Sequence, residues 1–188
     1  MRKSSRIDRI VVARFPLSKV LQVLSSSSGG TAVLDEIDRA ILAALLVNGR
    51  ISFRELSERI HLSPNAIAER IRRLQRVGVI AAVRAELNLT ALGRPLLALL
   101  DIRLVPGTRP EHFERTTRHL HGVLDAVHVT GDFDYQLRVA CRDANDLDDL
   151  VRRLKEQAGV RDSAIRIVLR QVDVDPTLTL LGPEPAPR

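Results

Sequence analysis

The sequence has few of the residues that disulfide frameworks, metal centres and membrane spans require. Its 188 residues include one cysteine and no tryptophan, and aromatic residues make up only 3% of them. A lone Cys141 excludes a disulfide framework and a cysteine-based zinc cluster, and no apolar run approaches the roughly 18 residues of a membrane-spanning helix. Asp8, Arg9 and Arg14 interrupt the place where a secretory signal would be apolar. We expect a cytoplasmic protein without a metal, a cofactor or a membrane partner.

The positive charge of the chain is unevenly distributed. A hydrophobic content of 45% over 188 residues is enough to bury a core in one large or two small domains. The net charge is +6, and residues 1–33 hold six basic and one acidic side chain, residues 34–86 nine and seven, and residues 87–188 fourteen and fifteen. The surplus that would attract a polyanion therefore lies in the first half of the chain.

Residues 1–33 have the composition of an extension rather than of a domain. They end in Ser25 to Gly30, SSSSGG, which is typical of a flexible linker. Pro16 interrupts any continuous helix before it. We predict a basic, disordered extension with at most one short helix. It can be an arm that follows DNA phosphates or a non-native extension from an upstream start codon.

Three short helices are predicted between residues 34 and 77. An apolar stripe from Leu34 to Leu45 marks the first, with acidic residues in its first turn. Ser52 stands three residues before Glu55, the spacing of a capping box, and begins the second. Ser63-Pro64, a capping hydroxyl followed by proline, begins the third. With an extended segment at residues 79–87, this is the outline of a winged helix-turn-helix over residues 34–86.

The third helix has one apolar and one polar face. The apolar face holds Ile67, Ile71, Leu74 and Val77, and the polar face holds Asn65, Glu69, Arg72, Arg73 and Arg76. Four arginines against one glutamate give residues 64–77 a local charge of +3. Positive charge clustered on one helix is typical of a surface that contacts DNA phosphates. The same pattern is also typical of a solvated surface helix, so charge alone does not decide the function.

From Leu96 the apolar period changes to the alternation of strands. Strands are predicted from Leu96, over residues 123–130 and 133–141, and through Ile165 and Ile167, and helices over residues 110–121 and 145–158. This β-α-β-β-α-β order predicts a ferredoxin-like sandwich at residues 96–175, after a linker at 87–95, and hence an α+β protein. We predict that residues 176–188 are a disordered tail.

Three segments of the chain resemble a known family. They are LDEIDRAILAALLVNGRIS (34–52), ELSERIHLSPNAIAERIRRLQRVGVI (55–80) and GDFDYQLRV (131–139). Together they resemble the Lrp/AsnC family of leucine-responsive and asparagine-responsive regulators, over roughly residues 34–175. The resemblance implies a transcription regulator that binds double-stranded DNA and responds to an amino acid or related metabolite. It also implies a homodimer, and dimers that assemble further, up to an octamer.

The resemblance places the DNA-facing surface on the third helix. The matching positions are Ser63, Asn65, Ala66, Glu69, Arg70 and Arg73, and the polar face of the helix adds Arg72 and Arg76. An arginine that binds a guanine edge through two hydrogen bonds discriminates by roughly 1–3 kcal/mol. Two of these residues have alternative structural roles, because Ser63 is needed as a helix cap and Arg70 can pair with a helix acid such as Glu58.

The effector site implied by the resemblance is the turn between the second and third strands. Its matching positions are Gly131, Asp132, Asp134 and Tyr135. Free backbone amides of a tight turn can accept a carboxylate, and an acidic side chain attracts an ammonium group. The alternative is that Gly131-Asp132 is only the turn that a hairpin requires.

Two other functions compete with a specific regulator. One is an architectural protein that wraps DNA with little sequence preference. The other is an enzyme similar to the sirohaem decarboxylases, which resemble this family and use histidine and arginine. Four histidines are available, His112, His119, His121 and His128, but their spacing gives no catalytic pair. We therefore expect that the protein is not an enzyme.

Overall fold

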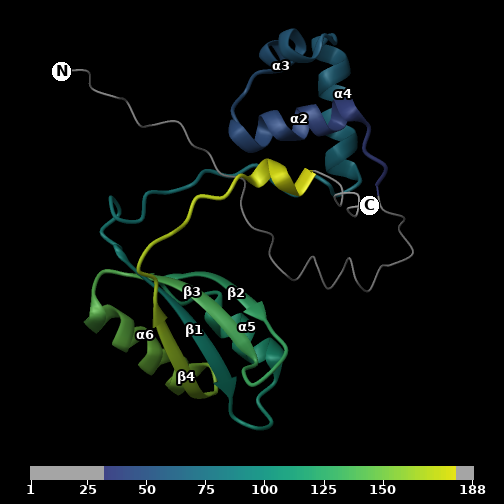
Figure 1. The fold of residues 1–188 in the computed structure, drawn as a ribbon. Helices are drawn as coiled ribbons and strands as arrows, with labels where there is room; N and C mark the ends of the chain where they lie inside the picture. The colour runs from purple at the N-terminus through teal and green to yellow at the C-terminus, as the bar shows by residue number, and fades with distance from the viewer. Residues whose placement is uncertain (1–31, 181–188) are drawn as a thin grey trace, which may run out of the picture. The chain divides into compact units, whose positions relative to one another are not determined.

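The computed structural model describes residues 32–180, which form two compact units. One unit contains residues 32–87 together with residues 173–180, and the other contains residues 88–172. Within the described residues, the first unit holds three helices and a short 3-10 helix, and the second holds four strands and two helices; Figure 1 labels the α-helices and the strands. The predictions for residues 1–31 and 181–188 lie outside the described residues.

The first unit is a helix-turn-helix whose helices begin where the sequence predicts. The helices are α2 (Glu36–Val47), α3 (Phe53–Ile60) and α4 (Pro64–Arg76). The hydroxyl of Ser52 accepts a hydrogen bond from the Glu55 amide at 3.1 Å, and that of Ser63 accepts one from the Ala66 amide at 3.2 Å. These bonds satisfy amides that have no partner within the helix.

The complete capping box lies at the start of α2 rather than α3. There the Asp38 amide donates to the Asp35 carboxylate at 2.7 Å, and the Asp35 amide donates to the Asp38 carboxylate at 3.3 Å. At α3 the Glu55 carboxylate bonds instead to Arg59, at 2.8 Å. The prediction for Ser52 is therefore confirmed for the hydroxyl and wrong for the reciprocal carboxylate, because a cation one turn further along the helix takes the carboxylate.

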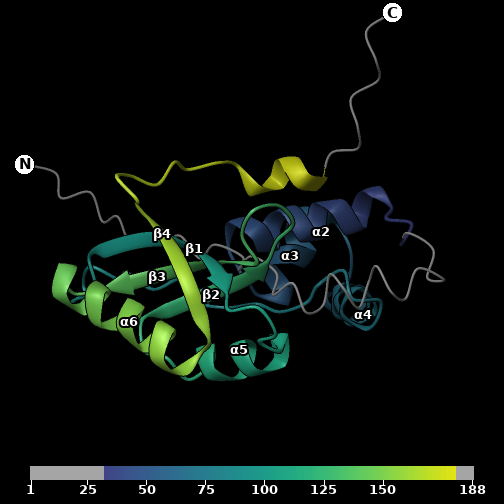
Figure 2. The same ribbon diagram turned by 90° about the horizontal axis from the view of Figure 1, so that it is seen from below.

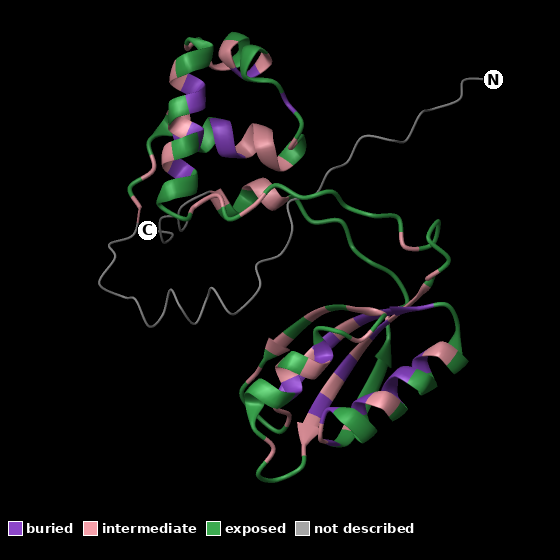
Figure 3. Cartoon of the chain, turned by 180° about the vertical axis from the view of Figure 1, so that it is seen from behind, coloured by how far each residue is buried: buried purple, intermediate pink, exposed green. Residues whose placement is uncertain are grey.

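The core of the first unit comes from the apolar faces of its three helices. Its buried residues are Ile41, Leu42, Ile51, Leu56, Ile67, Ile71 and Leu74. Figure 3 shows that the buried positions of α4 lie along one side of the helix, which leaves the opposite side exposed. Val77, predicted on the apolar face, is 53% exposed, because it lies beyond the last turn of α4.

The segment after α4 departs from the predicted wing. Gly78, with a φ of 77°, turns the chain out of the helix. Residues 79–95 follow without forming a strand. Within the described residues the helix-turn-helix therefore stands without a wing of paired strands.

The second unit is the predicted ferredoxin-like sandwich. Its elements are β1 (Leu96–Leu104), α5 (Pro110–Thr117), β2 (Val123–His128), β3 (Tyr135–Cys141), α6 (Ala144–Gln157) and β4 (Val160–Ile167). The strands are antiparallel in the order β2-β3-β1-β4. Figure 2 shows α5 and α6 on the same face of this sheet. Alternate residues of β1 and β3, such as Leu100 and Leu137, are buried against the helices.

The end of the described chain returns to the first unit. Residues 176–180, predicted as part of a disordered tail, instead form the 3-10 helix η1 (Pro176–Leu180), and Leu180 packs against the helix-turn-helix core. Asp175 caps this short helix, since its carboxylate accepts from the Thr177 amide at 2.9 Å and the Thr177 hydroxyl at 2.7 Å. The prediction was wrong because the Asp175-Pro176 pair begins a helical turn here rather than ending the fold.

Candidate functional site

The residues predicted to face DNA lie together on α4 and its cap. Ser63, Asn65, Glu69, Arg72 and Arg76 are exposed, and Ala66, Arg70 and Arg73 are partly exposed. The apolar face of α4 is buried in the unit, which fixes the direction in which this polar face points. The structure therefore presents one contiguous polar surface, 13 residues long, on the last helix of a helix-turn-helix.

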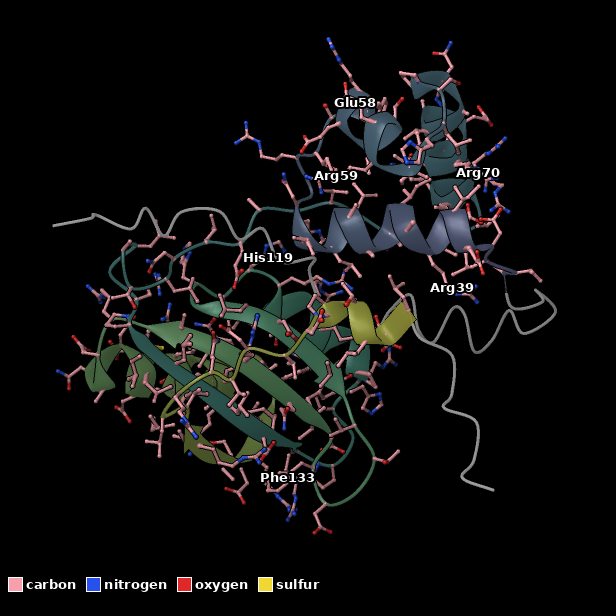
Figure 4. The ribbon with its side chains drawn as sticks, turned by 45° about the horizontal axis from the view of Figure 1, so that its top comes forward. Arg39, Glu58, Arg59, Arg70, His119 and Phe133 are labelled. Carbon is pink, nitrogen blue, oxygen red and sulfur yellow. The ribbon has the colours of Figure 1, made fainter. Side chains whose placement is uncertain are left out.

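Two arginines of this surface are tied to α2. The Arg70 guanidinium lies 2.6 Å from the Asp35 carboxylate and 3.0 Å from that of Asp38. Arg73 donates to the other oxygen of Asp38, whose side chain is fully buried. Figure 4 shows Arg70 on α4 beside the start of α2. A buried carboxylate requires paired cations, so this four-residue cluster joins α4 to α2.

The prediction that Arg70 can pair with a helix acid is confirmed, but Glu58 is not that acid, since Asp35 and Asp38 of α2 take its place. Glu58, on α3, bonds instead to Arg54 at 3.2 Å within its own helix. Asp38 was missed because it was counted only among the acidic residues of a helix N-terminus. Its position gives the signal, because it stands four residues after Leu34 and three before Ile41, on the apolar stripe of α2. A carboxylate on a buried stripe needs a basic partner from another element.

Hydrogen bonding shifts the pKa values of Asp35 and Arg70. The Asp38 amide, and then Arg70, lower the pKa of Asp35. The hydrogen bond that Arg70 donates to Asp35 in turn raises the pKa of Arg70. Asp35 is therefore ionised over a wider range of acid pH than a free aspartate, and the Asp35–Arg70 pair keeps both charges.

The other two arginines of α4 share one partner on the same helix. Arg72 lies 3.3 Å from one Glu69 carboxylate oxygen, and Arg76 lies 3.0 Å from the other. All three side chains are more than 60% exposed. Exposed pairs of this kind contribute little to stability, so a ligand can replace Glu69 as the partner of either arginine.

The predicted effector residues lie in one turn, but two of them have partners in the fold. The Asp134 carboxylate accepts from the Leu104 amide at 2.7 Å, and its own amide donates to the Ile102 carbonyl at 2.8 Å. Asp134 thereby joins the hairpin to the end of β1. Gly131 has a φ of 111°, which strains any other residue, and Asp132 is exposed.

Tyr135 lies in the core of the second unit. Its hydroxyl donates to the Glu114 carboxylate at 3.1 Å, and its ring stacks on His128 at 4.7 Å and contacts Phe113 at 4.3 Å. Burial, and then the Glu114 carboxylate, raise the pKa of Tyr135. The tyrosine is a neutral core residue with a satisfied hydroxyl.

The rim of the turn carries a further basic group that the sequence did not indicate. Arg103 donates from Nε to the Asp132 carbonyl at 2.9 Å, and its guanidinium lies 5.1 Å from the centre of the Phe133 ring. Phe133 is labelled at this turn in Figure 4. Arg103 follows the buried Ile102 in β1, so its place on the opposite face of the sheet could be predicted from the alternation, but its contact with the turn depends on tertiary folding.

The histidines do not form a common site. The His112 ring bonds to the Gln157 carbonyl at 3.0 Å, His128 stacks on Tyr135, and His119 and His121 are exposed. Within residues 32–180, no three histidine, cysteine or acidic side chains are grouped as metal ligands would be. No helix in the described part of the chain is long and apolar enough to cross a membrane.

Comparisons with known proteins match both units. The AsnC-type helix-turn-helix domain matches residues 34–75, and the Lrp/AsnC ligand binding domain matches residues 97–178. The leucine-responsive regulatory protein of Haemophilus influenzae is 38% identical over 143 residues, which cover 74% of this chain and 86% of that protein. The protein of the same name from Escherichia coli K12 is 38% identical over 142 residues, which cover 74% and 87%.

Solved structures are similar in fold to the whole pair of units. A transcriptional regulator from Neisseria meningitidis, in complex with L-methionine, has a TM-score of 0.72 and 30% identity, covering 79% of this chain and all of that one. The feast or famine regulatory protein from M. tuberculosis, complexed with L-methionine, has a TM-score of 0.71 and 32% identity, covering 77% and 97%.

Proposed function

Because the chain belongs to the Lrp/AsnC family of DNA-binding transcriptional regulators, we propose that α4 is the helix with which it reads double-stranded DNA. The observation that carries this proposal is the polar face of α4, which stays exposed while the opposite face is buried. A helix of 13 residues is about 20 Å long and fits the major groove, which is about 12 Å wide.

The contacts divide the predicted DNA-facing residues into two groups. Asn65, Glu69, Arg72 and Arg76 are exposed and suit base edges, because asparagine pairs with adenine, arginine with guanine and glutamate with cytosine. Ser63 and Ala66 lie at the N-terminus of α4, which suits a phosphate. We assign the remaining pair, Arg70 and Arg73, to positioning, since the buried Asp38 holds both of them.

For the second unit we propose an amino acid or a related metabolite as the effector. The support is its match to a ligand-binding domain, and the L-methionine held by two proteins of similar structure. At the turn, Gly131 and the exposed Asp132 are the positions that can receive the polar groups of such a ligand. Asp134 and Tyr135 then shape the turn, because both side chains already have partners.

We further propose a homodimer formed through the sandwich, with association of dimers up to an octamer. The face of the sheet opposite α5 and α6 presents the partly exposed Leu97 and Leu99. The same face holds Asp101 paired with Arg166 at 2.7 Å and Asp125 with Arg138 at 3.8 Å. A second copy would bury these leucines. Light scattering after size exclusion measures the assembly directly, and a monomer at micromolar concentration would contradict this proposal.

The test of the DNA proposal begins with in vitro selection of a preferred duplex by the full chain. Arg72→Ala and Arg76→Ala should each weaken binding to that duplex by roughly 1–3 kcal/mol. Arg54→Ala is the matched control, because Arg54 is also an exposed arginine that is ion-paired within its own helix, α3. Equal effects of all three substitutions would contradict reading by α4. If the selection enriches no sequence, and random DNA displaces the protein from every duplex equally well, the protein is architectural.

A thermal-shift screen of the amino acids tests the effector. A ligand that binds the folded state raises the melting temperature according to the logarithm of its concentration over its dissociation constant. Asp132→Asn should reduce that shift without changing the melting temperature of the free protein. No shift with any amino acid would contradict an amino-acid effector.

A further inference from the structure

Glu69 pairs with two exposed arginines of α4. Arg70 and Arg73 are committed to α2, so Arg72 and Arg76 are the arginines of this helix that remain for DNA. Both of them bond to Glu69, through different carboxylate oxygens, at 3.3 and 3.0 Å. One acidic residue therefore restrains both of these exposed cations.

We propose that Glu69 is a specificity-determining residue, which keeps Arg72 and Arg76 from random phosphates and releases them at a site that offers Glu69 a hydrogen-bond donor. This inference rests on the proposed reading of DNA by α4. The donor that fits is the amino group of cytosine, or of adenine, exposed in the major groove. The preferred duplex therefore has such a base opposite Glu69.

The restraint acts through the charge left behind when it opens. If a phosphate takes Arg72 or Arg76, the Glu69 carboxylate loses its partner beside a polyanion, and the like charges repel. At a matching base the carboxylate gains a new partner while the arginines bind guanine edges or phosphates. Glu69 thus weakens non-specific complexes by repulsion. In the specific complex, the new hydrogen bond to the base replaces its lost ion pairs. Repulsion of wrong partners is a general source of specificity.

The exposure of the three side chains allows this exchange. Glu69, Arg72 and Arg76 are 61%, 67% and 69% exposed, so water screens their pairing and DNA can open it. By contrast, Asp38 is fully buried between Arg70 and Arg73. Of the two carboxylates that hold arginines of α4 in pairs, Glu69 is the one that DNA can reach.

The decisive experiment compares Glu69→Gln with Glu58→Gln in the full chain. Glu58 also pairs with an exposed arginine, Arg54, and its loss changes the net charge by the same amount. Fluorescence anisotropy measures binding of both variants and the wild type to the selected duplex and to a scrambled one, between 50 and 200 mM salt. Circular dichroism melting confirms that both variants fold.

Glu69→Gln should bind the scrambled duplex about 10-fold more tightly, with a salt slope steeper by about one to two units, because one or two further phosphates are neutralised. Its affinity for the selected duplex should stay level or fall, so the ratio of specific to non-specific affinity drops about 10-fold or more. A repeated selection with this variant should lose the preference at one base pair. Glu58→Gln should change the affinity for both duplexes by the same factor.

Equal behaviour of the two variants would overturn the inference while leaving the proposed function intact. A wild-type chain that enriches no sequence would instead contradict the proposed function. In that case the scrambled duplex still decides the role of Glu69, because the restraint predicts tighter and steeper binding for Glu69→Gln alone. Failure of every variant to bind DNA would overturn both proposals.

Discussion

The helix-turn-helix unit and the sandwich unit use their polar motif residues in different ways. On α4, Glu69 bonds to Arg72 and Arg76, and all three side chains remain in water. In the β2–β3 turn, Asp134 and Tyr135 are bonded within the fold, to Leu104 and Glu114. The polar face of a helix can bind a ligand without loss of contacts within the fold. A tight turn instead needs several of its polar groups for hydrogen bonds that hold its own conformation.

The same contrast recurs within the helix-turn-helix unit. Asp38 is fully buried and holds two arginines, while Glu69 is exposed and holds two others. Two arginines of one helix are thus bonded to a neighbouring helix, and two stay exposed on its surface. Net charge could not separate these pairs, because all four count equally in the +3 of residues 64–77.

The largest expected effect tests whether the buried pair orients α4. Asp38→Asn leaves Arg70 and Arg73 without a buried anion, and breaking such a cluster costs about 3–5 kcal/mol. Hydrogen exchange should show faster opening of α2–α4 and unchanged protection of the sandwich. Asp35→Asn is the control, since Asp35 is half exposed and its loss should destabilise the unit less. Equal losses in both variants would contradict a special role for the buried carboxylate.

The next effect tests whether Asp134 belongs to the fold. Asp134→Ala leaves the Leu104 amide without its 2.7 Å partner, which should lower the free energy of unfolding of the sandwich by about 1–3 kcal/mol. Asp132→Asn, in the same turn but exposed, should change stability by less than about 0.5 kcal/mol. Urea titration of both variants measures the difference. A stable Asp134→Ala variant would place that carboxylate back among the free groups of the turn.

Local physical chemistry explains what could be predicted from the sequence. Ser52 and Ser63 begin helices because their hydroxyls cap nearby amides, a contact within three residues. The alternation around Leu100 and Leu137 predicts the strands, because one face of the sheet must be buried. The resemblance then supplied the family and its two domains.

What could not be predicted depends on contacts between distant residues. Asp38 is 35 residues from Arg73, and a helix-dipole interpretation already accounted for it. The roles of Asp134 and Tyr135 were open because the same residue types serve a ligand or a hairpin. The packing of Leu180 was missed for the same reason, since nothing near it in the sequence indicates the helix-turn-helix core.

A smaller effect distinguishes how the two units are completed. Within residues 32–180, the first unit takes η1 from the far end of this range, whereas the sandwich unit is the one continuous segment 88–172. Leu180→Ala should destabilise the helix-turn-helix unit by about 1 kcal/mol, below the 2–5 kcal/mol of a fully buried leucine because Leu180 is partly exposed. Leu178→Ala, 58% exposed in the same helix, should have almost no effect. Hydrogen exchange of α2 reports on both, and identical protection would show that η1 adds nothing to this unit.

The smallest effect concerns acid, and it should appear in the first unit. The folded pKa of Asp35 is lowered, first by the Asp38 amide and then by Arg70. A lowered carboxyl pKa adds stability above the unfolded value, about 3.9, and this stability is lost as the pH falls through the folded value. Between pH 5 and 3 the wild-type unit should therefore lose more stability than Asp35→Asn, which has no such proton to take up. Parallel acid profiles of the two proteins, followed by hydrogen exchange in α2, would show that the Asp35–Arg70 pair does not stabilise the attachment of α4.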